Sequence, residues 1–254
     1  MSFDVAATSY DRFMGVYSVQ LAPALADFAG VERGQRVLDV GCGPGALTGE
    51  LVRRLGVDSV AAVDPSEPFV AAARERHPGV DVRLAPAEDL PFDDDTFDVA
   101  LAQLVVHFMA DPVGGLREMA RVTRRAGVVA ACVWDLAGGR APLSPFWLAA
   151  RELDPNVEDE SGLAGGREGH LRALFEQADL RDVKEAELPA SLSYETFDEW
   201  WEPYTLGVGP AGAYCVALEP AARQALRHEL YLRLGSPGGP FTLSARAWAV
   251  RGTR

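Results

Sequence analysis

The segment "VLDVGCGPGALT", from Val37 to Thr48, limits the possible folds of the chain more than any other stretch. An apolar run typical of a buried strand ends in three closely spaced glycines, and a helical pattern follows them. Glycine adopts backbone angles that other residues avoid and lets a ligand approach the backbone closely. The segment therefore predicts a strand, a nucleotide-binding turn and a helix. A tight turn that only packs the helix on the strand is the structural alternative.

Short apolar runs alternate with helical patterns along the first half of the chain. The runs cover residues 36–40, 59–63, 80–84, 97–102 and 127–134. Such alternation is typical of an α/β fold, a parallel sheet with flanking helices. A helix over 171–180 and extended segments over 182–194 and 241–250 follow, while 135–144 and 158–170 have the composition of connecting loops.

We predict one domain over residues 1–254. Within it, residues 1–30 form an N-terminal helical cover, and residues 194–239 form a helical insertion before the last strand. This insertion is too long to be a turn, and we expect it to act as a lid.

Composition excludes several classes of protein. The chain of 254 residues carries a formal net charge of −13, which disfavours nucleic acid, and it has no apolar run long enough to span a membrane. Its first residues do not resemble a signal peptide, so we expect a cytoplasmic protein with a small-molecule substrate. The three cysteines are far apart, which predicts free thiols and no metal site. The short basic run over 121–125 is expected to be the solvated end of a helix.

Two acidic residues at strand ends suggest which nucleotide would bind. Asp39 interrupts an apolar strand, and a buried carboxylate is costly unless a partner compensates it, so we expect a cationic group to meet it. Asp64 ends the second strand and could accept hydrogen bonds from a ribose diol, or else cap the next helix. The glycines alone also fit a dinucleotide fingerprint, so a nicotinamide-dependent oxidoreductase is one alternative and a non-catalytic cofactor-binding protein is another.

Four segments together resemble the successive motifs of a class I S-adenosylmethionine-dependent methyltransferase. They are "VLDVGCGPGALT", "VDPSEPFVAAARER", "AEDLPFDDDTFDVALAQLVVHF" and "EMARVTRRAGVVAACVWD", within residues 10–135. The segment before the loop, and "SARAWAVRG" near the end, are similar to the small-molecule branch related to quinone-biosynthesis enzymes. The resemblance implies a Rossmann-like sheet of seven strands, the last antiparallel, with helices on both faces.

The resemblance also implies a binding site for S-adenosylmethionine, with S-adenosylhomocysteine as the product. Asp39 and Gly41 would contact the methionine end, Asp64 the ribose, Ala87 and Glu88 the adenine rim, and Gln103 the wall beside the sulfonium, while Tyr10 would close over the cofactor. The neighbouring Cys42, Gly43 and Pro65 complete the implied set.

One position departs from the family pattern. An acidic residue usually precedes the position of Ala87, and this chain has Pro86, which supplies neither an acceptor side chain nor a backbone donor. Either Glu88 takes over the adenine contact, or apolar packing and backbone groups hold the base alone.

The sequence gives fewer indications of which residues would bind the methyl acceptor than of those that would bind the cofactor. Positioning and desolvation carry most of a methyl transfer from a sulfonium, and a hydroxyl acceptor would also use a base, for which His107 is the best placed histidine. Trp200, Trp201 and Tyr204 could roof a pocket for a small apolar or aromatic metabolite, or simply pack the lid on the sheet. Because the two tryptophans are adjacent, only one is expected to face such a pocket directly.

Overall fold

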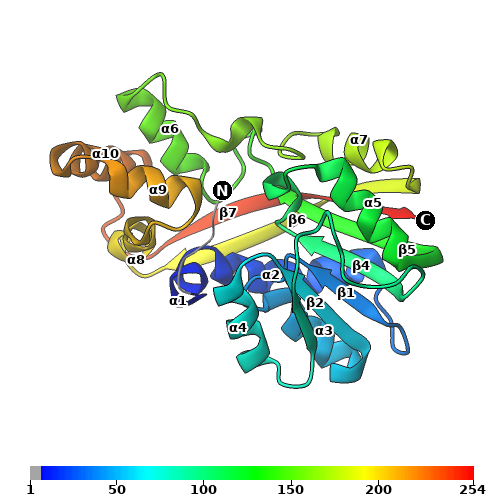
Figure 1. The fold of residues 1–254 in the computed structure, drawn as a ribbon. Helices are drawn as coiled ribbons and strands as arrows, with labels where there is room; N and C mark the ends of the chain where they lie inside the picture. Colours follow the sequence, from blue (N-terminus) through cyan, green and yellow to red (C-terminus); the bar gives the residue numbers. More distant parts are fainter. Residues whose placement is uncertain (1–6) are drawn as a thin grey trace.

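The computed structural model describes residues 7–254. They form one seven-stranded sheet with helices around it (Figure 1). The strand order is β3-β2-β1-β4-β5-β7-β6, and β7 runs antiparallel to both of its neighbours. The strands are β1 (Val37–Val40), β2 (Val60–Asp64), β3 (Asp81–Leu84), β4 (Phe97–Gln103), β5 (Thr123–Trp134), β6 (Arg181–Tyr194) and β7 (Phe241–Thr253). The predicted Rossmann-like sheet with an antiparallel last strand is confirmed.

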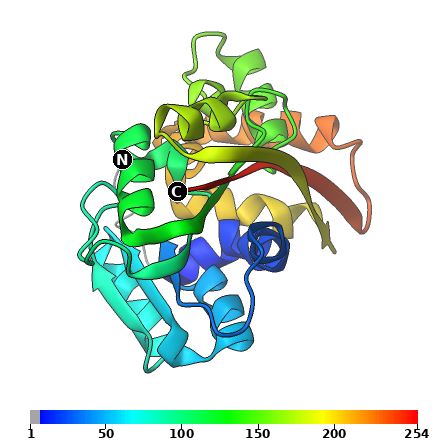
Figure 2. The same cartoon turned by 90° about the vertical axis from the view of Figure 1, so that its right-hand side faces the viewer.

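Helices cover both faces of the sheet (Figures 1 and 2). On one face lie α2 (Val16–Ala29), α3 (Ala46–Leu55) and α4 (Glu67–Arg76), and on the other α5 (Pro112–Val122) and α7 (His170–Gln177). The remaining helical elements are α1 (Ala7–Tyr10), η1 (Asp11–Gly15), η2 (Val57–Ser59), η3 (Val106–Phe108), α6 (Ser144–Leu153), η4 (Glu160–Gly162), α8 (Phe197–Trp201), η5 (Glu202–Leu206), α9 (Gly209–Ala217) and α10 (Pro220–Arg233).

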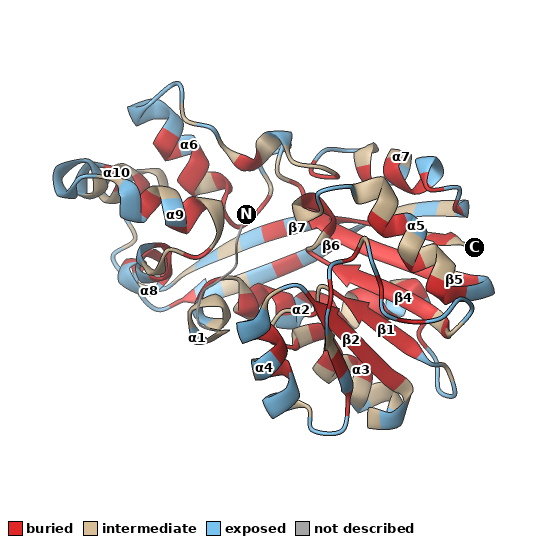
Figure 3. Cartoon of the chain, in the orientation of Figure 1, coloured by how far each residue is buried: buried red, intermediate tan, exposed pale blue. Residues whose placement is uncertain are grey.

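The central strands are buried on both faces, as Figure 3 shows. Every residue of β1 and β2 is buried, which explains why both strands are apolar along their whole length rather than alternating. Asp39 and Asp64 are the exceptions to this apolar character, and both lie toward the carboxyl ends of their strands. The strand ends are where ligands bind in open α/β sheets.

The β6–β7 pair extends beyond the rest of the sheet. Strand β5 ends at Trp134, opposite Ala247, whereas β6 and β7 remain paired as far as Tyr194 opposite Phe241. Helix α2 supports this extension, since Tyr17 and Tyr194 share a hydrogen bond of 2.6 Å between their hydroxyl oxygens. Helices α8, α9 and α10 leave from its end and gather with α6 at one side of the molecule (Figure 1).

The segment after β5 differs from the sequence prediction in one respect. Residues 135–144 form a loop as expected, but helix α6 follows at Ser144 and was not assigned from the sequence. Its apolar side chains, including Phe146 and Trp147, are buried, and α10 packs against it. The connection between β5 and α7 therefore contributes a packed helix to the region above the strand ends.

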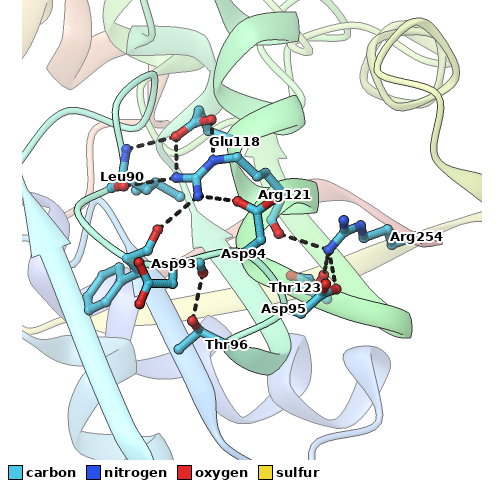
Figure 4. Close-up of polar contacts among 10 residues, drawn as sticks. Leu90, Asp93, Asp94, Asp95, Thr96, Glu118, Arg121, Thr123 and Arg254 are labelled. Atoms are coloured by element: carbon cyan, nitrogen blue, oxygen red, sulfur yellow. Dashed lines mark hydrogen bonds and ion pairs between the residues drawn. The ribbon is translucent and has the colours of Figure 1, made fainter.

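Two arginines of the basic run over 121–125 form local ion pairs. Arg121 forms ion pairs with Glu118 and Asp94 and donates to the backbone oxygen of Leu90, as Figure 4 shows. Arg124 pairs with Asp98. Contrary to the expected helix end, strand β5 begins at Thr123, so only Arg121 lies in the last turn of α5. Arg121 thus ties the loop before β4 to α5, and Arg124 links β5 to β4.

No helix within residues 7–254 is both long enough and apolar enough to cross a lipid bilayer. The three cysteines are free and buried, as the sequence predicted.

Candidate active site

Two adjoining cavities lie over the carboxyl ends of β1, β2 and β4. The larger, about 540 Å³, is lined by Asp64, Pro65 and the first turn of α4, and the smaller, about 400 Å³, by Asp39, Cys42 and the glycine turn. Tyr10, Gly41, Gly43 and Gln103 line both cavities. The combined space suits a nucleotide-sized ligand.

Asp39 lies at the floor of the smaller cavity and is 1% exposed. Its Oδ2 accepts a hydrogen bond of 2.6 Å from Thr48 Oγ1, and no cationic side chain within residues 7–254 pairs with it. Burial raises the pKa of Asp39 to about 7, with the negative charge of Asp64 adding to the shift. The expected cation is thus not supplied by the described chain. Thr48, which the sequence interpretation did not single out, orients the carboxylate from the first turn of α3.

Asp64 holds the glycine turn and the start of α4 together. Its Oδ2 accepts from the Gly43 amide and its Oδ1 from the Ser66 amide, each at 2.8 Å. Burial raises the pKa of Asp64, while the two backbone donors oppose the shift. Each carboxylate oxygen keeps a further acceptor position, so the turn contacts and a ribose diol are compatible. The alternative role of Asp64, capping the next helix, is partly confirmed, because Asp64 accepts from the amide of Ser66 directly before α4.

The glycine turn brings the backbone close to its neighbours. Gly41 has φ +70°, and a Cβ at this position would lie 2.4 Å from Val105 Cγ2. Gly43 has φ +54°. A Cβ added at Gly43 would have no atom within 4 Å, because this position faces the open cavities. Glycine is therefore required at Gly41 by contact and favoured at Gly43 by backbone angle.

The N-terminal segment closes one side of both cavities. The Tyr10 ring packs edge-on against Phe69 of α4, with centroids 5.3 Å apart, and its hydroxyl lies 3.4 Å from Ser18 Oγ. Next to it, Asp11 accepts from Arg76 Nη1 at 3.1 Å. These contacts hold Tyr10 over the two cavities.

Gln103 ends β4 between the two cavities. Its Nε2 donates to Ser18 O at 3.0 Å, and its Oε1 is buried with no hydrogen-bond partner in the described chain. Leu104 follows with φ +60°, an uncommon angle for leucine that turns the chain sharply toward the site.

Sequence reasoning did not single out several further residues that line the two cavities, four of which contact the glycine turn, lie in the first turn of α4 or border Gly41. These four are Phe69, Arg76, His77 and Val105. His77 lies against the turn, with Nε2 2.9 Å from Gly45 O. The one sequence signal for these four residues is that they follow the strands of the predicted motifs. Their own residue types form no distinctive pattern.

Ala87 and Glu88 line neither cavity. Ala87 is buried in the core beneath α5, and Glu88 Oε1 accepts from the amides of Ala110 and Asp111 at 2.7 and 3.2 Å. The Glu88 side chain therefore fixes the loop before α5 and is not directed at the larger cavity. This geometry gives no support to Glu88 as a replacement for the adenine contact missing at Pro86.

A third, small cavity of about 40 Å³ adjoins the first and shares Tyr10, Leu104 and Phe108 with it. His107 lines this cavity, with Nδ1 buried and without a hydrogen-bond partner in the described residues. Burial lowers the pKa of His107 to about 3, so the ring is neutral at physiological pH. A neutral imidazole can accept a hydrogen bond there, but with this pKa it retains a proton poorly, which weakens its predicted role as a base.

The three aromatic residues of the insertion pack inward. Trp200, Trp201 and Tyr204 are buried, and Tyr204 stacks on Phe146 of α6 with centroids 4.7 Å apart. None of the three lines the cavities described above. Their contacts correspond to the alternative in which they pack the insertion, while Val208–Ala211 at the start of α9 reach the third cavity instead.

The chain is similar to a known protein family, to known sequences and to solved structures. Residues 38–131 match the family model described as "Methyltransferase domain". This range contains the glycine turn, Asp39, Asp64 and Gln103. The chain carries a class I methyltransferase domain.

Related sequences are methyltransferases. The chain is 38% identical over 152 residues to 2-methyl-6-phytyl-1,4-hydroquinone methyltransferase 2, chloroplastic, of Oryza sativa, covering 59% of this chain and 40% of that protein. It is 38% identical over 110 residues to ubiquinone/menaquinone biosynthesis C-methyltransferase UbiE of Idiomarina loihiensis, covering 41% and 44%. The chain thus spans less than half the length of each of these two relatives.

Solved structures share the fold over nearly the whole chain. The YcgJ protein of Bacillus subtilis has a TM-score of 0.58 at 20% identity, covering 92% of this chain and 97% of that one. The [4+2]-cyclase SpnF has a TM-score of 0.56 at 20% identity, covering 92% and 80%. These likenesses, at 20% identity, concern the fold alone.

A methyltransferase domain of this class takes its methyl group from S-adenosylmethionine. The described residues fit that cofactor, because Asp39 lines the smaller cavity as a buried carboxylate that pairs with no cationic side chain in residues 7–254, and S-adenosylmethionine carries an ammonium group. The turn beside Asp39 excludes a side chain at Gly41.

We predict that Asp39→Asn changes the pH dependence of stability of the ligand-free protein. The folded pKa of Asp39, about 7, lies above its unfolded value, so its contribution is fully present below about pH 4 and is lost as pH rises through 7. The free energy of unfolding of Asp39→Asn relative to wild type should therefore rise by a few kcal/mol between pH 5 and pH 8.

Urea unfolding at both pH values measures this difference. The exposed Asp58→Asn serves as the control and should show no comparable change. Parallel pH profiles for Asp39→Asn and wild type would contradict the account of Asp39.

Proposed function

We propose that the chain transfers a methyl group from S-adenosylmethionine to a small, uncharged acceptor with an apolar or aromatic body. The observation that carries the proposal is the pair of buried carboxylates, Asp39 and Asp64, on the two sides of one glycine turn and lining adjoining cavities. Such a pair suits a nucleoside that carries both a diol and an ammonium group. The neighbouring third cavity is mostly apolar.

The cofactor, when bound, supplies an activated methyl group on a sulfonium. In this proposal Asp39 binds the ammonium end, Asp64 binds the ribose, and Tyr10 covers the ligand from the N-terminal segment. Gln103 lines both cofactor cavities, and Leu104 and Phe108 form the wall between the larger of them and the third cavity. These residues hold the reacting groups in line and exclude water, which is the main demand of such a displacement.

A nicotinamide-dependent oxidoreductase is not favoured. A pyrophosphate at the turn would place two negative charges next to Asp39, which already has no cationic partner in residues 7–254. The relatives by sequence are methyltransferases.

A role without methyl transfer remains a distinct candidate because one structural neighbour is titled a [4+2]-cyclase. In that case the chain would bind the cofactor and show no transfer to any acceptor. Turnover separates this candidate from the proposal, while cofactor binding does not.

Two segments form the cover in this proposal, namely residues 1–30, of which 1–6 lie outside the described part, and the insertion over 194–239. They meet through Phe13 and Tyr204, whose ring centroids are 4.9 Å apart, and through an exposed ion pair between Arg12 and Glu202. Both segments contribute to the third cavity, through Phe13 and Val208. An exposed ion pair contributes little stability, so the junction can open at small cost on the solvent side.

Binding of S-adenosylhomocysteine is the first test. We expect it to raise the midpoint of thermal unfolding of wild type, while NADH at the same concentration does not. Asp64→Asn should weaken binding by about 1.5–3 kcal/mol, the scale of hydrogen bonds to a charged group, as measured by isothermal titration calorimetry. Stabilisation by NADH alone would overturn the proposal in favour of the oxidoreductase.

Hydrogen exchange tests the cover. With S-adenosylhomocysteine, exchange should slow in residues 8–20, in part of 194–215 and in the glycine turn, since the cover then packs against the nucleoside. Asp39→Asn at the same ligand concentration is the control and should show weaker protection. Slowing confined to residues 37–110 would mean that the two segments do not respond to the cofactor.

A further inference from the structure

The third cavity contains a group of buried polar atoms that the proposed cofactor site does not use. Glu160 of η4 lines the cavity together with His107 and Trp134. Trp134 Nε1 and His107 Nδ1 are both buried without a hydrogen-bond partner in the described residues. A buried polar atom normally has a partner, so two orphaned atoms on one cavity point to a ligand group that would satisfy them.

Glu160 is held so that one oxygen remains available. Its Oε2 accepts a hydrogen bond of 2.7 Å from Trp147 Nε1, and no hydrogen bond to its Oε1 occurs among the described residues. The residue is 4% exposed, and the hydrogen bond from Trp147 of α6 fixes its carboxyl group, which borders both the third cavity and a cavity of about 150 Å³ on its other side. A fixed, buried carboxyl group with a free oxygen is suited to accept a proton.

The rest of the lining restricts the chemistry of the acceptor. Most of it is apolar, with Phe13, Met14, Leu104, Phe108, Leu143 and Val208 among its members. Within residues 7–254 no lysine or arginine lines this cavity. A carboxylate or phosphate would therefore find no compensating charge, whereas a neutral hydroxyl on an apolar body would find both a donor and an acceptor.

We propose that Glu160 accepts the hydroxyl proton of the methyl acceptor, and that this acceptor is a neutral phenol-like molecule; the inference rests on the proposed methyl transfer. In the step, the hydroxyl oxygen forms the new bond to the methyl carbon of S-adenosylmethionine, and the carbon–sulfur bond breaks with its electron pair passing to sulfur. The hydroxyl proton passes to Glu160. Trp134 Nε1 donates to the acceptor oxygen, and His107 remains neutral.

The charged and titratable groups near Glu160 are compatible with this role. Burial raises the pKa of Glu160 to about 7, and the charge of Asp159 adds to the shift. Asp159 is itself paired with Arg151, at 3.1 Å. Burial also raises the pKa of Tyr204 and lowers that of His107, so neither changes charge near neutral pH. The remaining titratable group that lines the cavity is Tyr10, whose pKa is raised by burial.

The cavity has room for only about two or three water-sized groups, so a ring enters only when its lining moves. The residues that can move belong to the cover, namely Phe13 and Met14 on one side and Val208 to Ala211 on the other. Trp134 belongs to strand β5, and Glu160 is buried and hydrogen-bonded to Trp147 of α6, so these two residues are held by the core. The acceptor hydroxyl would thus meet fixed polar groups, while its ring is enclosed by the cover.

The test uses 2-naphthol as the acceptor probe and its O-methyl ether as the matched probe without a hydroxyl hydrogen. Calorimetry is carried out on the full chain saturated with S-adenosylhomocysteine, for wild type, Glu160→Gln and Trp147→Phe. Glu160→Gln keeps the volume and the acceptor for Trp147, whereas Trp147→Phe keeps the carboxylate and removes the bond that orients it.

We expect wild type to bind 2-naphthol more tightly than the ether, and more tightly at pH 8 than at pH 6, as Glu160 ionises. Glu160→Gln should weaken 2-naphthol binding about tenfold and abolish the pH dependence. Trp147→Phe should retain a pH dependence with a shifted midpoint. All three proteins should bind S-adenosylhomocysteine equally.

Turnover separates proton transfer from binding. With S-adenosylmethionine and 2-naphthol, kcat of Glu160→Gln should fall about 100-fold or more while the KM for the cofactor is unchanged. Equal kcat, or binding by wild type without any turnover, overturns the role of Glu160 as proton acceptor. If S-adenosylhomocysteine binds and 2-naphthol does not, the phenol-like acceptor is excluded and the proposed function survives; if neither binds, the proposed function fails.

Discussion

The burial of Asp39 without a cation is the constraint on which the site depends. The sheet places this carboxylate inside an otherwise apolar strand, and Thr48 is the only side chain that donates to it in the described residues. One hydrogen bond does not compensate the desolvation of a charge, which is why the pKa of Asp39 rises to about 7. The fold therefore carries a cost in the ligand-free state that an ammonium group would offset. The glycine turn and its two cavities give such a group a place to bind.

Much of this arrangement was predictable from the sequence because local patterns determine it. The strands around Asp39 and Asp64 are apolar along their whole length, the glycines mark the turn, and Gln103 ends the next strand, so parallel pairing alone brings all three side chains to one edge. The antiparallel last strand followed from the family resemblance. For the strands, the glycine turn and Gln103, the sequence pattern that indicates each element lies within that element or a few residues from it.

The acceptor side was less predictable because it is assembled from distant segments by packing. Helix α6 follows a loop rich in glycine, and its apolar face gave no distinct signal beside the acidic stretch that contains Glu160. From the sequence, Trp200 and Trp201 could have lined a substrate pocket. In the structure both are buried against Tyr204 in an aromatic cluster. His107 was placed correctly at the strand end, but its lowered pKa comes from burial, which depends on the packing of the whole chain and cannot be read from nearby residues.

Proton release on cofactor binding tests the central claim most directly. If an ammonium group pairs with Asp39, binding of S-adenosylhomocysteine at pH 7 must ionise the protonated fraction of that carboxyl group. Titration calorimetry in buffers of different ionisation enthalpy measures the protons released. We predict roughly half a proton per site for wild type, because pH 7 is close to the pKa, and none for Asp39→Asn. Binding without proton release, or with equal release in both proteins, would contradict the role of Asp39.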